Sequence, residues 1–157
     1  MFSAWMDEMP AGLSALTARG DTPVGQGCLW LQGSSDCSNY TYATTYEQNL
    51  TNRIAGVRNV VGDADLPVII GGIYQWSTYS DIVKQAQQNV ALHDDHTWYF
   101  DTDDLPMQTI ETYHYTSDGV LTVGSRFADV YLNQVVPEPA SLSLLLLGGF
   151  MLCRRWR

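Results

Sequence analysis

The chain has 157 residues, of which 17 are acidic and 8 are basic, and its formal net charge at pH 7 is −9. This length is enough for one domain and a short tail. A surface this acidic repels phosphate groups, which argues against nucleic acid as a partner and suits a neutral substrate.

The first half of the chain alternates between helix and strand patterns. Apolar residues at helical spacing predict a helix over residues 8–19, which Gly20 ends. A short apolar run predicts a buried strand over residues 27–31. The clearest helix is predicted over residues 44–61, where the apolar stripe consists of Tyr46, Leu50, Ile54, Val57 and Val61.

The second half continues the alternation. β-Branched residues bounded by proline and glycine predict a strand over residues 67–74. A helix is predicted over residues 79–92, a strand over 97–100 and a last helix over 117–134. The residues expected to face inward from these two helices are Ile82, Ala86 and Val90 in the first, and Val120, Val123, Phe127 and Val130 in the second.

This order of elements predicts an α/β fold, in which a parallel sheet lies between helices in three layers. Functional groups in such sheets gather at the carboxyl ends of the strands, here Gln32-Gly33, Tyr74-Gln75 and Asp101-Thr102. Three strands make a narrow sheet with poorly covered edges. We therefore expect the N-terminal part of the domain to lie upstream of this sequence.

Residues 135–157 have the composition of a membrane tail behind a domain of residues 1–134. Two prolines break the preceding structure, and residues 140–153 then carry no charge before a cluster of arginines. This apolar segment predicts a C-terminal transmembrane helix of about 21 Å, with the arginines on the cytoplasmic side and the domain outside. The alternative is a buried core helix, although such a helix is rarely apolar all round.

Pro137-Glu138-Pro139, the apolar segment and the arginines together resemble the PEP-CTERM sorting tail of exported bacterial proteins. The resemblance implies attachment to the membrane and removal of the tail by a dedicated protease-like sorting enzyme. Residues 1–20 offer no export signal, because Asp7 and Glu8 lie where an apolar core is needed. This again predicts that the chain is the C-terminal part of a longer protein.

Two cysteines, Cys28 and Cys37, lie within the domain. Outside the cytoplasm they could form a disulfide that closes a short loop, or remain two separate buried thiols. The sequence leaves both alternatives open.

Three histidines are candidates for chemistry. His93 and His96 flank two aspartates in a short polar segment, where a metal site has no third well-spaced ligand and a solvated loop is expected. His114 follows Glu111 by three residues, so a carboxylate could hold one ring nitrogen while the other accepts a proton. This spacing is compatible with a general base and its acidic partner, whereas on its own it is more typical of a helix-capping or surface histidine.

Several segments resemble the sialate O-acetylesterase-like carbohydrate esterases of the SGNH hydrolase superfamily. Residues 30–36, WLQGSSD, resemble the block W-x-Q-G-E-x-D, and residues 83–87, VKQAQ, resemble an Arg-x-Ala-Gln helix. Residues 101–105 resemble a T-D-L stretch. The E-x-x-H-Y and G-S-R-F-A segments, which begin at Glu111 and Gly124, resemble the family's D-x-x-H-Y and G-x-R-x-A ending. The resemblance covers roughly residues 10–133.

The resemblance implies an SGNH- or flavodoxin-like fold and hydrolysis of acetyl esters on carbohydrates without a cofactor. His114 would be the catalytic base, Glu111 its partner, and Gln32 with Gly33 part of the oxyanion hole. The sequence departs from the family at Ser34, where the block has glutamate. The G-Q-S-N block that carries the family's serine is absent, so no nucleophile is assigned and this chain by itself is expected to be inactive or nearly so.

Two other classes of function are compatible with the sequence. A non-catalytic surface module could keep the esterase scaffold to bind carbohydrate or matrix, and Ser34 in place of glutamate favours this slightly. A metal-dependent enzyme could use His93 and His96, and we expect no such metal.

Overall fold

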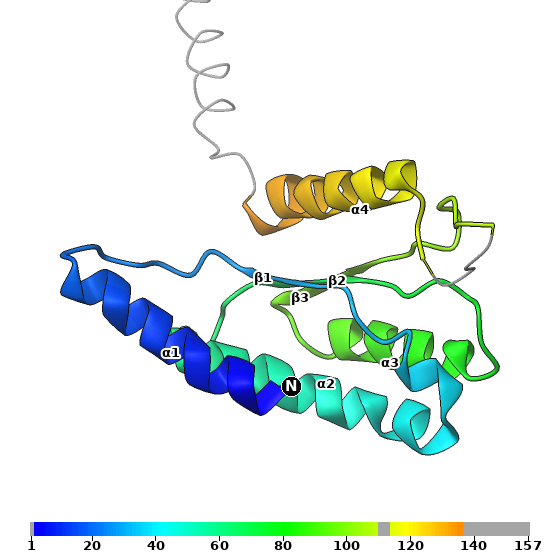
Figure 1. Ribbon diagram of the computed structural model, residues 1–157, viewed down its shortest axis with the longest axis horizontal. Helices are drawn as coiled ribbons and strands as arrows, with labels where there is room; N and C mark the ends of the chain where they lie inside the picture. The colour runs from blue at the N-terminus through cyan, green and yellow to red at the C-terminus, as the bar shows by residue number, and fades with distance from the viewer. Residues whose placement is uncertain (1, 110–113, 137–157) are drawn as a thin grey trace, which may run out of the picture.

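The computed structural model describes residues 2–109 and 114–136 (Figure 1). Three short strands form a parallel sheet: β1 (Cys28–Trp30), β2 (Val68–Gly71) and β3 (Thr97–Phe100), in the order β1-β2-β3. In the register, Leu29 lies opposite Ile69, which in turn lies opposite Trp98. The predicted α/β fold with a parallel three-stranded sheet is confirmed.

Helices cover both faces of this sheet, as Figure 1 shows. Helices α2 (Tyr40–Val61) and α3 (Ser80–Leu92) lie on one face, and α1 (Phe2–Ala18) packs along α2. Helix α4 (Ser117–Val130) lies on the opposite face and continues into a π-helical turn, η2 (Tyr131–Val135). A single 3-10 turn, η1 (Asp36–Ser38), connects the end of β1 to α2. The three predicted layers are therefore present.

The core has one cluster on each face of the sheet. All four residues of β2 are buried, because the central strand has helices above and below it, and this explains its continuous apolar sequence. Each fully buried leucine or isoleucine contributes about 1.5–3 kcal/mol. The cluster under α2 and α3 includes Tyr46, Leu50, Ile54, Val68, Ile70, Val83, Ala86 and Val90, and the cluster under α4 includes Ile69, Leu105, Val123, Phe127 and Val130.

Helix boundaries differ from those predicted. Helix α2 begins four residues before the expected residue 44, because the side chain of Asn39 accepts a hydrogen bond from the Tyr42 N–H and caps its N-terminus. Helix α1 begins at Phe2 rather than near residue 8.

The predicted inward position of Val120 is wrong: its side chain is 58% exposed. Gly119 occupies the inward place instead, where an added Cβ would lie 2.8 Å from the Pro106 carbonyl oxygen. The face that packs on the sheet is therefore formed by Gly119, Val123, Phe127 and Val130.

Two further predictions concern the C-terminal tail and the cysteines. None of the helices in residues 2–109 and 114–136 is long and apolar enough to cross a membrane, and the predicted tail helix 140–153 lies outside the described residues.

Cys28 and Cys37 are separate thiols, the second of the two alternatives, and burial raises the pKa of both.

Candidate active site

The carboxyl ends of the three strands meet at one edge of the sheet and are joined by hydrogen bonds. The Thr102 hydroxyl, after β3, donates to the Gly72 carbonyl after β2 at 2.6 Å. The Gln75 N–H donates to the Asp103 carboxylate at 3.1 Å. Gln87 on α3 reaches the end of β1, where its amide donates to the Gln32 carbonyl. The three segments that were predicted to lie at the carboxyl ends of the strands therefore meet at this edge.

The peptide between Gln32 and Gly33 is held from one side. The Gln32 carbonyl accepts hydrogen bonds from the Tyr46 hydroxyl at 2.7 Å and from the Gln87 amide at 2.9 Å. Both donors are buried, and Gln87 is fixed in turn because its side-chain oxygen accepts from the Ile73 N–H at 3.2 Å. In a planar trans peptide the N–H points opposite to the C=O. The Gly33 N–H therefore points away from Tyr46 and Gln87.

The Tyr46 hydroxyl stays protonated and can therefore act as a donor in this network. Burial raises the pKa of Tyr46 to about 12, so the hydroxyl keeps its proton at any physiological pH. It also accepts a hydrogen bond from the Trp30 indole N–H at 3.1 Å. The tryptophan and glutamine of the W-x-Q-G block are thus both joined to one tyrosine of α2.

Gly33 has a conformation that favours glycine. Its φ is +135°, and a Cβ at this position would lie 3.0 Å from each of Ile73, the Tyr46 hydroxyl and Val83. A side chain here would push apart the groups that orient the peptide. The glycine of the block is therefore required for the close packing of β1 against α2 and α3.

We expect Gly33→Ala to lower the free energy of unfolding by about 1–3 kcal/mol, because the backbone strain and the crowding both act on the folded state. Urea unfolding at constant m-value measures this loss. Gly124→Ala is the matched control. Apart from its chain neighbours and its own helix backbone, no atom lies within 4 Å of the added Cβ, and the position lies in helix α4, so alanine should stabilise by about 0.5–1 kcal/mol. Equal effects of the two substitutions would contradict the strained position of Gly33.

The side chain of Gln32 is engaged within its own block. Its amide donates to the Asp36 carboxylate at 2.7 Å, and its oxygen lies 3.2 Å from the Tyr46 hydroxyl, whose single proton is nearer to the Gln32 carbonyl. One amide hydrogen is thus used by Asp36 at an exposed position. The exposed side chain retains a second N–H that is compatible with binding a developing negative charge.

His114 lies in the connection between β3 and α4, and its side chain is exposed. Its carbonyl accepts from the Gln108 N–H at 2.9 Å, and the neighbouring Tyr115 forms a β-bridge with Met107. The Tyr115 hydroxyl also lies 2.7 Å from that of Thr102. These contacts attach the His114 segment to the carboxyl end of β3. Glu111 lies outside the described residues, so its pairing with His114 stays a prediction.

A cluster of charges beside this segment was not predicted from the sequence. Lys84 of α3 is only 8% exposed and forms ion pairs with Asp101, at 3.1 Å, and with Asp103. Burial opposes both charges, yet hydrogen bonds outweigh it: the pKa of Lys84 is raised and that of Asp101 is lowered. From the other face, Arg126 of α4 donates to the Asp101 carbonyl at 2.6 Å and pairs with Asp104. Cations from both helix layers thus hold residues 101–104.

The sequence did contain a signal for the ion pairs of Lys84 and Arg126 with residues 101–104. Lys84 occupies a position in the segment VKQAQ that resembles the cation of an Arg-x-Ala-Gln helix, and Arg126 belongs to the segment GSRFA. Their positions relative to the aspartates depend on how α3 and α4 pack on the sheet, which the sequence alone does not give.

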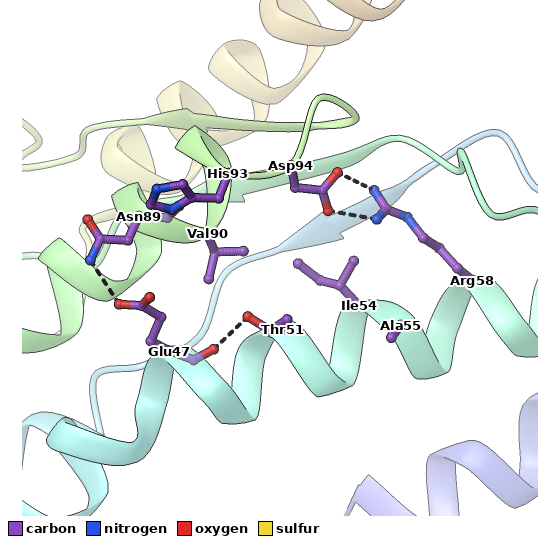
Figure 2. Close-up of a pocket in the computed structure, with 9 residues that line it drawn as sticks. All are labelled: Glu47, Thr51, Ile54, Ala55, Arg58, Asn89, Val90, His93 and Asp94. Carbon is purple, nitrogen blue, oxygen red and sulfur yellow. Dashed lines mark hydrogen bonds and ion pairs between the residues drawn. The ribbon is translucent and has the colours of Figure 1, made fainter.

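A second polar region lies between α2 and α3, around a cavity of about 180 Å³ (Figure 2). Arg58 binds both carboxylate oxygens of Asp94, at 2.6 and 3.2 Å, and also donates to the carbonyls of Leu66 and His96. Asp94 precedes β3, so this region lies at the amino ends of the strands, opposite the candidate site. Its contacts join the loops before β2 and β3 and have a structural role.

The histidines of the metal alternative lie in this second region. The His93 ring nitrogen contacts the Asn89 carbonyl at 2.8 Å, and His96 lies 3.6 Å from Asp65. Within the described part of the chain no group of three or more His, Cys, Asp or Glu side chains is arranged to hold a metal ion. Asp94, one of the two aspartates between these histidines, is already bound by Arg58.

Comparison with known proteins decides the family. The family model described as carbohydrate esterase, sialic acid-specific acetylesterase matches residues 9–133, which is most of the chain. The chain belongs to this carbohydrate esterase family. A probable carbohydrate esterase of Arabidopsis thaliana is 29% identical over 105 residues, which are 67% of this chain and 39% of the relative.

Solved structures agree with the fold of this carbohydrate esterase domain. The X-ray structure of the same Arabidopsis protein superposes with a TM-score of 0.70 at 25% identity, covering 82% of this chain and 52% of that one. A carbohydrate acetylesterase from Xanthomonas citri superposes with a TM-score of 0.57 at 21% identity, covering 68% and 25% of the two chains. The chain therefore spans about half or less of the length of these relatives.

Proposed function

We propose that this chain provides the oxyanion-binding loop and the general base of a serine-type carbohydrate O-acetylesterase. The observation that carries the proposal is the Gln32-Gly33 peptide, whose carbonyl is fixed by Tyr46 and Gln87 at the carboxyl edge of a parallel sheet. Membership of the carbohydrate esterase family supports the reaction class, and an acetylated sugar is the proposed substrate.

The proposed reaction proceeds through an acetyl-enzyme. A serine hydroxyl attacks the acetyl carbonyl carbon while His114 accepts the hydroxyl proton, and the carbonyl oxygen becomes an oxyanion. The Gly33 N–H and the Gln32 amide would donate to this oxyanion, and each such donor typically raises the rate about 10²–10³-fold. Collapse of this intermediate breaks the bond from the acetyl carbon to the sugar oxygen, which takes the proton from His114 and leaves as a hydroxyl. Water then attacks the acetyl-enzyme by the same route and releases acetate.

Glu111 has the role of orienting the base in this proposal. Its carboxylate would accept a hydrogen bond from one ring N–H of His114, which leaves the other nitrogen unprotonated and able to take the serine proton. The glutamate is one methylene longer than the aspartate of the family block.

The proposal assigns no nucleophile to these residues, because the 157 residues contain no G-Q-S-N block. We expect the chain by itself to hydrolyse p-nitrophenyl acetate no faster than its His114→Ala variant does. A spectrophotometric assay of released p-nitrophenol measures this. Turnover by the unmodified chain that His114→Ala abolishes would overturn the assignment, because it would require a nucleophile within these residues.

A second candidate is a non-catalytic module that binds carbohydrate. Ser34 in place of glutamate favours it, as does the engagement of the Gln32 amide by Asp36. In this case calorimetry would detect binding of an acetylated oligosaccharide that mass spectrometry shows to remain fully acetylated. Binding with loss of acetyl groups supports the esterase instead.

For the location, we propose that residues 135–157 form a sorting tail that attaches the protein to the membrane and is removed by a sorting protease. The domain would then act outside the cytoplasm, where acetylated polysaccharides are accessible. The sequence of Pro137-Glu138-Pro139, an uncharged segment and an arginine cluster supports this proposal. The acidic net charge supports the absence of nucleic acid among the partners.

A further inference from the structure

Helices α2 and α3 leave a groove between them that opens to solvent. Two buried alanines, Ala43 of α2 and Ala86 of α3, line its floor and belong to the core cluster that these helices share. Small side chains let the two helices approach closely at this point, and longer side chains on either side form the walls. The result is a hollow of about 440 Å³ on the outer surface of the helix layer.

The walls of this groove carry groups that form hydrogen bonds with hydroxyls. Helix α2 contributes Thr44 and Glu47, and α3 contributes Asp81 and Asn89. Gln75 donates to Asp81 at 2.9 Å, and Asn89 donates to Glu47 at 2.8 Å. A carboxylate accepts more than one hydrogen bond, so both acidic groups retain capacity for hydroxyl donors. None of the described residues that line the groove is a lysine, an arginine or a histidine.

An aromatic pair lies at one end of the groove. Tyr40 begins α2 and Tyr79 directly precedes α3, and their ring centroids are 5.5 Å apart with an interplanar angle of 63°. Tyr40 lies on the same side of α2 as Ala43 and Thr44, which follow three and four residues later. Tyr79 packs against the core, whereas Tyr40 is 59% exposed. An edge-to-face pair leaves at least one face of each ring uncovered by the other ring.

The aromatic end of the groove is the end nearer the candidate active site. The N-termini of α2 and α3 lie at the end of the sheet to which the strands' carboxyl ends point (Figure 1). The Ser77 hydroxyl donates to the Cys37 carbonyl at 2.9 Å, which joins the loop before α3 to η1 behind the W-x-Q-G block. At the other end, Glu47 and Asn89 line both the groove and the cavity of Figure 2, so their hydrogen bond lies between the two.

The chemistry of the groove identifies a class of ligand. A sugar ring combines a face of C–H groups, which suits a tyrosine face, with hydroxyls, which suit carboxylate and amide groups. The groove spans about 12 Å along α3 from Asp81 to Asn89, which gives room for a few linked sugar units. Two carboxylates without a basic group among the described lining residues repel a negatively charged ligand. The groove therefore suits an uncharged oligosaccharide.

We propose that the groove between α2 and α3 binds an uncharged oligosaccharide chain, with one sugar ring stacked on Tyr40, and that it selects neutral polysaccharides over those that carry sialic or uronic acids. The inference rests on the proposed function, since the groove holds the polymer while an acetylated unit beyond the tyrosine end reaches Gln32 and Gly33.

The test uses the full chain and xylohexaose, an uncharged oligosaccharide without acetyl groups. Nuclear magnetic resonance should show shifted amides in the parts of α2 and α3 that flank the groove, and calorimetry measures the Kd. Tyr40→Ala should raise the Kd at least tenfold. Tyr42→Ala is the matched control, because Tyr42 is also 59% exposed but lies two positions along the helix and does not face the groove. It should change the Kd less than twofold, and urea unfolding checks that both variants are folded.

The charge of the groove is tested with hexagalacturonate, which has the same number of sugar units but carries carboxylates. It should bind at least tenfold more weakly than xylohexaose. The double variant Glu47→Gln with Asp81→Asn should reduce this difference, because it removes both negative charges from the walls and keeps groups that form hydrogen bonds.

Three results would overturn the groove proposal. They are xylohexaose that shifts no amide around the groove, equal losses of affinity in the two tyrosine variants, and binding of hexagalacturonate as tight as that of xylohexaose. Because the probe has no acetyl group, its binding does not depend on the esterase chemistry. Binding in the groove together with p-nitrophenyl acetate turnover that His114→Ala abolishes keeps the groove and rejects the assignment made under the proposed function. The reverse pair of results rejects the groove and keeps that assignment.

Discussion

Replacing Gln87 with leucine is expected to destabilise the protein by about 1.5–4.5 kcal/mol, since leaving the buried Ile73 N–H without an acceptor costs about 1–3 kcal/mol and the loss of one of two donors to the Gln32 carbonyl costs about 0.5–1.5 kcal/mol. The Ile73 N–H would lose its acceptor, and the Gln32 carbonyl would keep only the Tyr46 hydroxyl. Leucine is close in volume to glutamine, so the loss reports hydrogen bonding rather than a cavity. Urea unfolding followed by circular dichroism measures it.

Gln85→Leu on the same helix is the control for this prediction. Gln85 is exposed and its amide donates to the Asn89 side chain at the surface, so its replacement should change stability by less than about 0.5 kcal/mol. In a completed enzyme, the proposed role of the Gly33 N–H in binding the oxyanion predicts that Gln87→Leu lowers kcat more than it raises KM. An effect of Gln87→Leu no larger than that of Gln85→Leu would contradict the role assigned to Gln87.

Arg58→Met is expected to cost about 2–4 kcal/mol, toward the low end of the range for breaking a buried ion pair, because the pair with Asp94 is only partly shielded from water. The substitution also removes the donor to the Leu66 and His96 carbonyls before β2 and β3. Arg19→Met is the control, since its ion pair with Asp21 is largely exposed and should contribute less than about 0.5 kcal/mol.

The same pair predicts a dependence of stability on pH. Burial opposes the charge of Asp94, but hydrogen bonds from Arg58 and from the His96 N–H outweigh it and lower the pKa of that carboxyl. Its stabilising contribution is therefore complete above the ordinary aspartate pKa and is lost as the pH falls through the lowered value. Unfolding measured against pH should show this acid-side loss in the unmodified protein and a smaller one in Arg58→Met. Parallel curves would contradict the assignment.

The sheet was predictable because its strands are apolar runs with distinct boundaries. Pro67 and Gly71 delimit β2, and the intervening helices carry clear stripes such as Leu50, Ile54 and Val57. The inward face of α4 was only partly predicted. A glycine carries no apolar signal, so the close approach of Gly119 to the Pro106 carbonyl could not be read from periodicity, and Val120 was placed inward by default.

The site was predictable where a short block specified it and not where tertiary contacts build it. The W-x-Q-G block located Gln32 and Gly33 at the end of a strand. Tyr46 was predicted as a core residue of α2, but its hydroxyl bond to the Gln32 carbonyl depends on the packing angle of that helix. The ion pairs of Lys84 have the same origin, because they join residues of α3 to a loop seventeen or more positions away.

The two cations that hold residues 101–104 differ in how strongly salt affects their ion pairs. Asp104 is largely exposed in its pair with Arg126, whereas Lys84 is buried, so added salt weakens the ion pair with α4 more than the ion pairs with α3. At high ionic strength Asp104 should therefore separate from Arg126 in a larger fraction of molecules, while the hydrogen bond from Thr102 to the Gly72 carbonyl keeps the loop on the sheet. Ionic strength would then change how firmly this loop is joined to α4 without changing the sheet itself.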